Sequence, residues 1–206
     1  MRKLIIWNLA LFSTAFLFSC SDSDDPQPEE NLEAVLVESL HAPADVMDRQ
    51  TGEIIEENSY QYFSFEENEL VASKEGNWDL GIKGLSMIVN NGISGDGNAE
   101  ATIVQGVFEQ YNSIPEDVQL KSDTAEGLAI PSGSGNGWYN YNMATHIVSP
   151  QPGNILIIKT NAGNFVKMEI LSYYKDSPPL DEVELTTPSA HYTFQYVIQP
   201  NGSREF

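Results

Sequence analysis

Apolar and polar residues alternate with a period of two along much of the chain, which is the pattern of a strand that buries one face. In residues 191–199 every second side chain, from Tyr192 to Ile198, is aromatic or aliphatic. Residues 61–65 and 78–83 alternate in the same way. These segments are therefore predicted to be half-buried β-strands.

Two further β-rich runs, residues 155–160 and 165–173, are joined by the sequence Asn-Ala-Gly-Asn. Asparagine and glycine accept the positive φ angles of tight turns, so the two runs are predicted to form a hairpin. Other clusters of turn residues lie at 90–98, 131–137, 150–154 and 200–202. No segment after residue 40 keeps an apolar helical stripe for three turns. The pattern predicts an all-β fold, a single antiparallel domain that is sandwich-like or barrel-like.

The first residues of the chain differ from this pattern. Arg2 and Lys3 precede a short apolar run that ends at Phe18, and this order is typical of a secretory signal. The run is shorter than the roughly 20 residues that a membrane-spanning helix needs. It ends in Leu-Phe-Ser-Cys, which resembles the lipobox of bacterial lipoproteins. Cys20, the only cysteine, is therefore expected to be lipidated. The alternative is a secreted protein with an unpaired cysteine.

The segment that follows Cys20 is acidic and contains two prolines, so it buries little apolar area and is predicted to be a flexible tether. We expect a signal peptide over residues 1–19, a lipidated acidic tether over residues 20–33 and a β domain over residues 34–206. Acids directly after a lipidated cysteine resemble the export signal of Bacteroidetes surface lipoproteins. The expected location is the bacterial outer membrane, lipid-anchored and exposed at the cell surface.

The charge of the chain and the spacing of its polar residues argue against nucleic-acid binding and against the common catalytic and metal-binding motifs. The formal net charge is −20, with 10 basic and 30 acidic residues, so nucleic acid is not an expected partner. The glycines around Ser94 and Ser134 lack the spacing of a nucleophile elbow. The three histidines form no short-spaced metal pair, and acidic pairs carry little information in so acidic a chain. Residues 96–100 lack the spacing of a calcium loop. No catalytic residues are assigned, and the protein is not expected to be an enzyme.

Several segments between residues 60 and 206 together resemble one family. They are residues 62–65, 77–80, 91–97, 135–146, 155–159, 164–175, 192–196 and 199–204. The series is similar to the HmuY family of Bacteroidetes haem-binding surface lipoproteins. The resemblance implies an HmuY-type β domain that binds haem without catalysis, takes part in iron acquisition, and passes haem to a TonB-dependent outer-membrane receptor.

The resemblance also implies candidate haem ligands. The family's second axial position falls on Met143, whose thioether suits ferrous haem iron. Its first axial position lies in the stretch that matches residues 121–134, which contains neither histidine nor methionine. His146 and Met87 are the further candidates for axial ligands. Met143 is equally compatible with a packing role, whereas Met87 is expected mainly to pack in the core. His191 is interpreted as a half-exposed strand residue.

Other side chains could complete such a site. Trp138, Tyr139 and Tyr141 precede Met143 and are candidates for lining a pocket, because aromatic rings stack on a porphyrin or on a sugar face. Three cations, Lys121, Lys159 and Arg204, could pair with haem propionates. The alternative function is a surface lipoprotein of the same fold that binds a glycan, another tetrapyrrole or a protein partner without metal ligation. A purely structural surface protein is the third hypothesis.

Overall fold

Antiparallel strands are the main regular structure of the computed structural model, which describes residues 32–206. The signal peptide, Cys20 and nearly all of the expected tether lie outside the described residues. Within them, helix is confined to two 3-10 turns, η1 (Phe108–Gln110) and η2 (Leu180–Glu182). No helix in this part of the chain is long and apolar enough to cross a bilayer. The predicted all-β fold class is confirmed.

The larger sheet has five strands in the order β1-β13-β12-β11-β8. Its strands are β1 (Val35–His41), β8 (Glu100–Gln105), β11 (Asn154–Lys159), β12 (Phe165–Tyr174) and β13 (Ser189–Gln199). The predicted hairpin is confirmed, since Lys159 pairs with Phe165 and residues 161–164 form the turn between β11 and β12. The pairing of β1 with β13 contains a bulge between Val37 and Leu40.

The smaller sheet has four strands in the order β5-β4-β6-β7. Its strands are β4 (Gln61–Ser64), β5 (Glu69–Val71), β6 (Leu80–Lys83) and β7 (Ser86–Val89). Two of them correspond to the predicted segments 61–65 and 78–83. Trp78, which the alternation assigned to a strand, instead precedes β6 in the chain, although it is fully buried.

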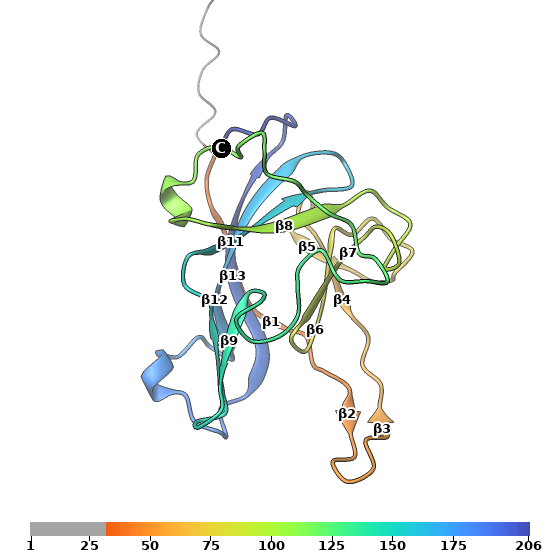
Figure 1. Cartoon of the computed structure of the whole chain (residues 1–206), viewed down its shortest axis with the longest axis vertical. Helices are drawn as coiled ribbons and strands as arrows, with labels where there is room; N and C mark the ends of the chain where they lie inside the picture. The colour runs from red at the N-terminus through yellow and green to blue at the C-terminus, as the bar shows by residue number, and fades with distance from the viewer. Residues whose placement is uncertain (1–31) are drawn as a thin grey trace, which may run out of the picture. The chain divides into compact units, whose positions relative to one another are not determined.

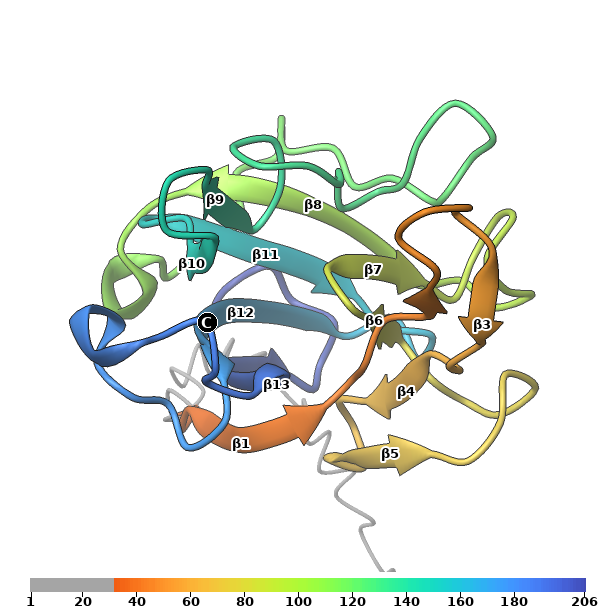
Figure 2. The same ribbon diagram turned by 90° about the horizontal axis from the view of Figure 1, so that it is seen from below.

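The main core lies between the two sheets, which face each other when the molecule is seen from below (Figure 2). Phe63 of β4 meets Phe194 of β13 edge to face, with ring centroids 5.5 Å apart. Phe65 meets Tyr196 in the same manner at 5.0 Å. Edge-to-face contact is a favourable geometry for aromatic pairs, so these rings hold the sheets together.

The outer face of the larger sheet is also covered in part. Ile114 packs there with Ile155, Ile157 and Phe165 in a second cluster. On β13 the predicted inward face is confirmed for Tyr192, Phe194 and Tyr196, which are all buried. The opposite face is less exposed than alternation predicts, because connecting segments cover Thr193 and Gln199. A period of two identifies the strand but does not reveal what packs on its polar face.

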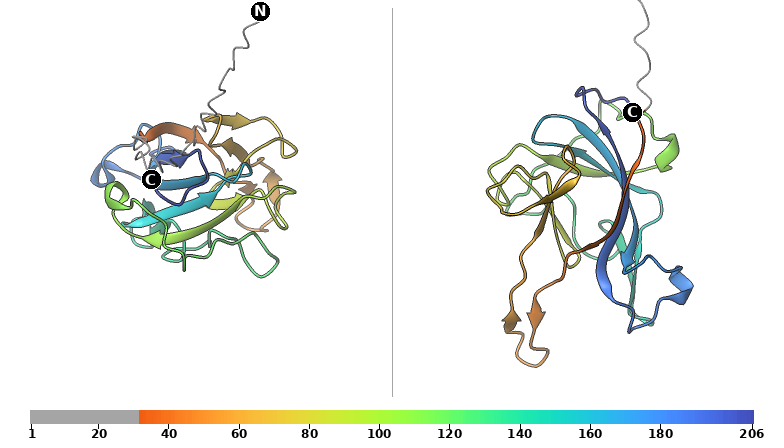
Figure 3. Two further views of the ribbon diagram at one scale, coloured as in Figure 1. Left: turned by 90° about the horizontal axis from the view of Figure 1, so that it is seen from above. Right: turned by 180° about the vertical axis from the view of Figure 1, so that it is seen from behind.

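Two small hairpins extend from one end of the sheets, opposite the C-terminus (Figures 1 and 3). The first pairs β2 (Val46–Met47) with β3 (Ile54–Glu56), and the second pairs β9 (Tyr139–Asn142) with β10 (Ile147–Pro150). The β9–β10 hairpin, counted with its turn, carries four of the residues that the sequence assigned to a site: Tyr139, Tyr141, Met143 and His146. This end of the molecule is therefore the first candidate for a functional surface.

Candidate functional site

Met143 lies in the turn that joins β9 to β10, and 77% of it is exposed to solvent. The turn is closed by Asn142, whose side-chain oxygen accepts hydrogen bonds from the backbone N–H groups of Ala144 (2.9 Å) and Thr145 (3.2 Å). The carbonyl of Asn142 also accepts from the N–H of His146 at 2.7 Å. Asparagine commonly closes turns in this way. The local sequence thus presents the Met143 thioether to solvent at a hairpin tip.

His146 belongs to the same turn and adopts a positive φ of 59°. Its Nδ1 lies 2.6 Å from the hydroxyl oxygen of Tyr141, so the two side chains form a hydrogen bond across the hairpin. This contact fixes the ring through one nitrogen and leaves Nε2 outside the bond. The structure therefore brings Met143, His146 and Tyr141 together at one tip.

The other two candidate pocket residues lie deeper. Trp138 is buried, and its indole N–H donates to the carbonyl of Leu85 at 3.2 Å. Its ring packs against Tyr139 at 5.0 Å and against Tyr192 at 5.1 Å. These contacts anchor the start of β9 to the main core, so Trp138 supports the hairpin from within.

Met87 lies in β7 and is only 1% exposed. It belongs to the main core, and its strand neighbour across the β6–β7 pair is Ile82. A ligand could reach this thioether only if the core opened. Met87 is thus separate from the tip that carries Met143 and His146.

A pocket of about 310 Å³ lies beside the start of β9. Its lining comes from three regions: the segment leading into β2, the β6–β7 turn and the start of β9. The lining residues are Ala44, Asp45, Met47, Lys83, Gly84, Leu85, Ser86, Ser132 and Tyr139. Of the candidate residues, Tyr139 alone lines this pocket. Its volume is at the lower limit of small-molecule sites.

Lys83 provides the positive charge of this pocket. Its Nζ lies 2.9 and 3.1 Å from the two carboxylate oxygens of Asp45, and 5.1 Å from the centre of the Tyr60 ring. The hydrogen bond to Asp45 raises the pKa of Lys83, so the ammonium stays charged. An anionic ligand group that enters here would compete with Asp45 for this ammonium.

Met47 is a second exposed thioether, which the sequence analysis did not single out. It is 55% exposed, lines the pocket and lies in a hairpin whose other exposed apolar residues include Val46, Ile54 and Ile55. In the sequence, this hairpin is indicated by two apolar pairs, residues 46–47 and 54–55, on either side of the polar segment 48–53. Such a surface-exposed group of aliphatic side chains is unusual away from an interaction site.

The cations that were expected near haem propionates lie outside this pocket. Arg204 donates hydrogen bonds to the carbonyls of Ile114 (3.1 Å), Pro115 (2.7 Å) and Val118 (3.0 Å), so it has a structural role. Lys159 lies 3.9 Å from Glu100, and Lys121 pairs through its backbone with Ala101. None of the three lines the pocket near β9.

Residues 121–134, where the resemblance led us to expect the family's first axial position, are held close to the smaller sheet. Asp123, 1% exposed, accepts hydrogen bonds from the backbone N–H groups of Val89 (2.9 Å) and Ala129 (2.7 Å). Its own carbonyl accepts from the N–H of Ile93 at 3.1 Å. These bonds tie the connection to β7 and to the loop that follows it.

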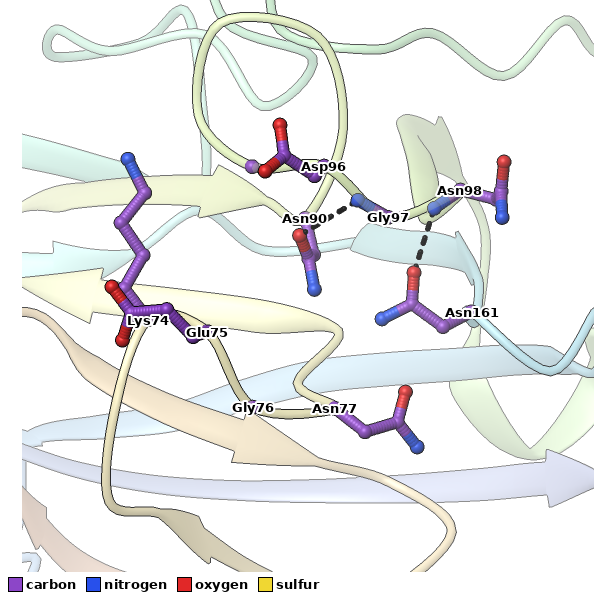
Figure 4. A pocket seen from close by; sticks show the side chains of 10 residues that line it. Lys74, Glu75, Gly76, Asn77, Asn90, Asp96, Gly97, Asn98 and Asn161 are labelled. Atoms are coloured by element: carbon purple, nitrogen blue, oxygen red, sulfur yellow. Dashed lines mark hydrogen bonds between the residues drawn. The ribbon is translucent and has the colours of Figure 1, made fainter.

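A larger, polar pocket of about 710 Å³ lies elsewhere, among the loops at residues 74–77 and 90–98 (Figure 4). Asn90 and Asn161 have structural roles in its wall, because both donate to the carbonyl of Trp78. Their side-chain oxygens accept from the N–H groups of Gly97 and Asn98 respectively. Charged Lys74, Glu75 and Asp96 also line this pocket, and no aromatic residue does.

The protein therefore belongs to the class of antiparallel β proteins that are built from two sheets. At the end opposite the C-terminus it carries the β2–β3 and β9–β10 hairpins and a pocket beside Tyr139. The HmuY family model, described as HmuY protein, matches residues 56–196. The chain therefore belongs to the HmuY family, which confirms the resemblance seen in the sequence.

Three solved structures that are similar to the chain come from bacteria. The apo HmuY analog of Tannerella forsythia is 14% identical with a TM-score of 0.47, over 82% of this chain and 97% of that one. A Bacteroides vulgatus protein, described as HmuY-like and heme-binding, is 12% identical with a TM-score of 0.46, over 83% and 93%. Apo PinO from Porphyromonas gingivitis is 14% identical with a TM-score of 0.46, over 81% and 97%. No curated protein matches the chain.

Proposed function

We propose that the protein is a haem-binding lipoprotein of the bacterial outer membrane. Membership of the HmuY family is the observation that carries this proposal, because the family's expected ligand is haem. The role is capture and transfer of haem, without catalysis.

Met143 is the proposed axial ligand. Its side chain is largely exposed at the tip of the β9–β10 turn, so an iron centre reaches the thioether without any opening of the core. A thioether is a soft ligand that favours ferrous iron. His146, in the same turn, is the proposed alternative or additional ligand through Nε2, since its Nδ1 bonds to Tyr141.

The pocket beside Tyr139 supports a role for this end of the molecule in holding a flat apolar ligand. Exposed apolar residues of the β2–β3 hairpin adjoin it, and burial of such residues under a porphyrin would stabilise the complex. Lys83 is the cation available to a propionate there, and it replaces Lys121, Lys159 and Arg204 in the proposal.

Haem titration of the purified full chain tests the proposal under both air and dithionite. We expect a Soret shift that is stronger in the ferrous state, and a loss of that shift in Met143→Ala. Leu70→Ala, which truncates an exposed apolar side chain on β5, is the matched control. No Soret shift in either redox state would remove haem as the ligand. An unchanged ferrous spectrum in Met143→Ala would remove that residue as the axial ligand.

The anchor and the transfer step complete the proposed function. Lipidation of Cys20 would hold the domain at the outer membrane, and the acidic tether would let it reach haem outside the cell and a TonB-dependent receptor. Cys20→Ser is expected to move the protein from the membrane fraction to the soluble fraction. Protease treatment of intact cells tests surface exposure, because a periplasmic protein stays protected.

A glycan is the second candidate ligand, and the polar pocket lined by Lys74, Glu75 and Asp96 is the observation that favours it. Amide and carboxylate groups suit sugar hydroxyls, although this pocket offers no aromatic face for stacking. Binding on a glycan array that is lost in Asp96→Ala and kept in Met143→Ala would support this alternative.

A further inference from the structure

His41 and His191 lie 150 residues apart in the chain, and the structure stacks their rings face to face. They occupy opposite positions in the β1–β13 pair, with ring centroids 4.3 Å apart and planes inclined by 16°. Tyr192, the next residue on β13, points into the main core, so alternation directs His191 to the outer face of the sheet. His41 is exposed and His191 is half-buried, so solvent reaches both rings.

The neighbouring backbone fixes this pair. The β1 bulge places Ser39 so that its hydroxyl lies 3.2 Å from Nδ1 of His191, and its N–H donates to the Thr193 hydroxyl at 3.1 Å. Ser177 donates to the same Thr193 hydroxyl at 2.7 Å. A histidine held through one ring nitrogen presents the other to a ligand, which is the usual arrangement around metal-binding imidazoles.

Backbone strain gathers around the same pair. Six residues other than glycine have positive φ in the described part of the chain, and four of them adjoin the pair in sequence or through these contacts. They are Ser39 (53°), Asp176 (60°), Ser177 (47°) and Ala190 (59°). Such conformations cost about 1–3 kcal/mol each and tend to gather at functional sites.

We propose that His41 and His191 bind a divalent first-row transition-metal ion, with Cu²⁺ the tightest of the series. Imidazole nitrogen suits such ions, and affinity in this series is highest for Cu²⁺. Two nitrogens bound to one ion lie about 3 Å apart. Each nitrogen binds along its own ring plane, and the two planes are now inclined by only 16°. The side chains must therefore rotate until the planes of the two rings meet at the ion. No three His, Cys, Asp or Glu side chains gather around a metal position within residues 32–206, so water completes the coordination.

The arrangement distinguishes this site from the proposed haem site. The two rings come from one face of the sheet and their centroids are 4.3 Å apart, so they are close enough to occupy neighbouring positions on a bare ion. Axial ligands of haem iron must instead approach from opposite sides of the porphyrin. The two proposals therefore stand independently.

The surroundings of His191 favour metal binding at neutral pH. Burial, together with the adjacent His41, lowers the pKa of His191, while a hydrogen bond to the Ser39 backbone opposes this change. Lys175 lowers the pKa of His191 further and Asp176 raises it. A neutral imidazole is the form that binds a metal, so affinity is expected to fall as the pH is lowered and the imidazole takes up a proton.

Cu²⁺ alone, titrated into the purified full chain, tests the proposal by calorimetry and by electron paramagnetic resonance. All proteins carry Cys20→Ser, which removes the thiol as a competing ligand. We expect one tight Cu²⁺ equivalent with a spectrum showing two nitrogen ligands. His41→Gln and His191→Gln should each weaken binding at least tenfold, and Ser39→Ala about tenfold.

His146→Gln is the matched control, because it removes the third histidine and leaves the pair intact. Since His41 is exposed, His41→Gln should keep the urea midpoint of its parent, which separates lost ligation from lost folding. Unchanged Cu²⁺ affinity in the double variant His41→Gln/His191→Gln would overturn the proposal. An equal loss of affinity in His146→Gln would overturn it as well.

Discussion

The hydroxyl oxygen of Tyr141 lies 2.6 Å from Nδ1 of His146, across the hairpin turn that also carries Met143. Two candidate haem ligands are thus held in one short turn, and one of them has a fixed ring. The bond to Tyr141 determines which nitrogen of His146 remains for a ligand. Contacts of this kind orient a ligating imidazole and sharpen its affinity.

Removal of the Tyr141 hydroxyl tests this relationship. If His146 contributes to haem binding, Tyr141→Phe should weaken ferrous haem binding by about tenfold, because the imidazole loses its orienting partner. The ring remains, so stacking is preserved. Soret titrations of Tyr141→Phe, His146→Gln and the double variant are the measurement. Additive losses in the double variant would show that the two side chains act separately and contradict the relationship.

The strands that could be predicted from the sequence are those with clear local patterns. β13 alternates strictly from Tyr192 to Tyr196, and the β11–β12 hairpin has a turn rich in asparagine and glycine. β1 and β8 were not predicted. The bulge between Val37 and Leu40 breaks the alternation of β1, and β8 has no regular period in its short sequence.

The candidate site could be predicted only where it is local. Met143, His146 and Tyr141 are close in sequence, so a hairpin turn is sufficient to gather them. The pocket that joins Met47, Lys83 and Tyr139 depends on contacts between distant segments, which no local period reveals. The pairing of His41 with His191 also joins distant segments, so it could not be predicted from the sequence. It follows from the register of β1 and β13.

Asp123 is expected to be important for stability. Asp123→Ala leaves the buried N–H groups of Val89 and Ala129 without their acceptor. Each unpaired buried donor costs about 1–3 kcal/mol, so for two donors the free energy of unfolding should fall by about 2–6 kcal/mol. Urea denaturation measures the change. Glu126→Ala, an exposed acid in the same segment, is the control, and an equal effect of the two substitutions would refute this role.

Asp79 should make stability depend on pH. It is 1% exposed, and burial raises its pKa to about 7 against 3.8 for a free side chain, although hydrogen bonds from Asn161 and Phe65 oppose the rise. Between pH 3.8 and about pH 7, Asp79 is protonated in the folded protein and ionised in the unfolded chain. The stabilising contribution is therefore complete below about pH 4 and is lost as the pH rises through 7.

Comparing the pH dependence of stability in the native protein and in Asp79→Asn isolates the contribution of the Asp79 carboxyl group. From pH 5 to pH 8 the native protein should lose more unfolding free energy than Asp79→Asn, by at most about 3 kcal/mol. Asparagine does not titrate, so the variant keeps only the pH dependence of the remaining groups. Its overall stability is expected to be lower, because the amide nitrogen faces a backbone N–H. Parallel pH profiles for the two proteins in urea denaturation would contradict a raised pKa at Asp79.

Gly97 is required by the tight packing of the loop that walls the polar pocket. A Cβ at this position would lie 2.7 Å from the backbone oxygen of Asn90 and would also meet the Asn161 side chain. Backbone cannot yield as a flexible side chain does, so Gly97→Ala should lower the free energy of unfolding by about 1–3 kcal/mol. Gly127→Ala is the matched control, since its Cβ meets nothing within 4 Å. That control should leave stability unchanged or raise it by up to about 1 kcal/mol, through the lower entropy of the unfolded chain. Equal unfolding midpoints for the two variants would show that the loop relaxes around Asn90, and the polar pocket would then be more adaptable than its hydrogen bonds indicate.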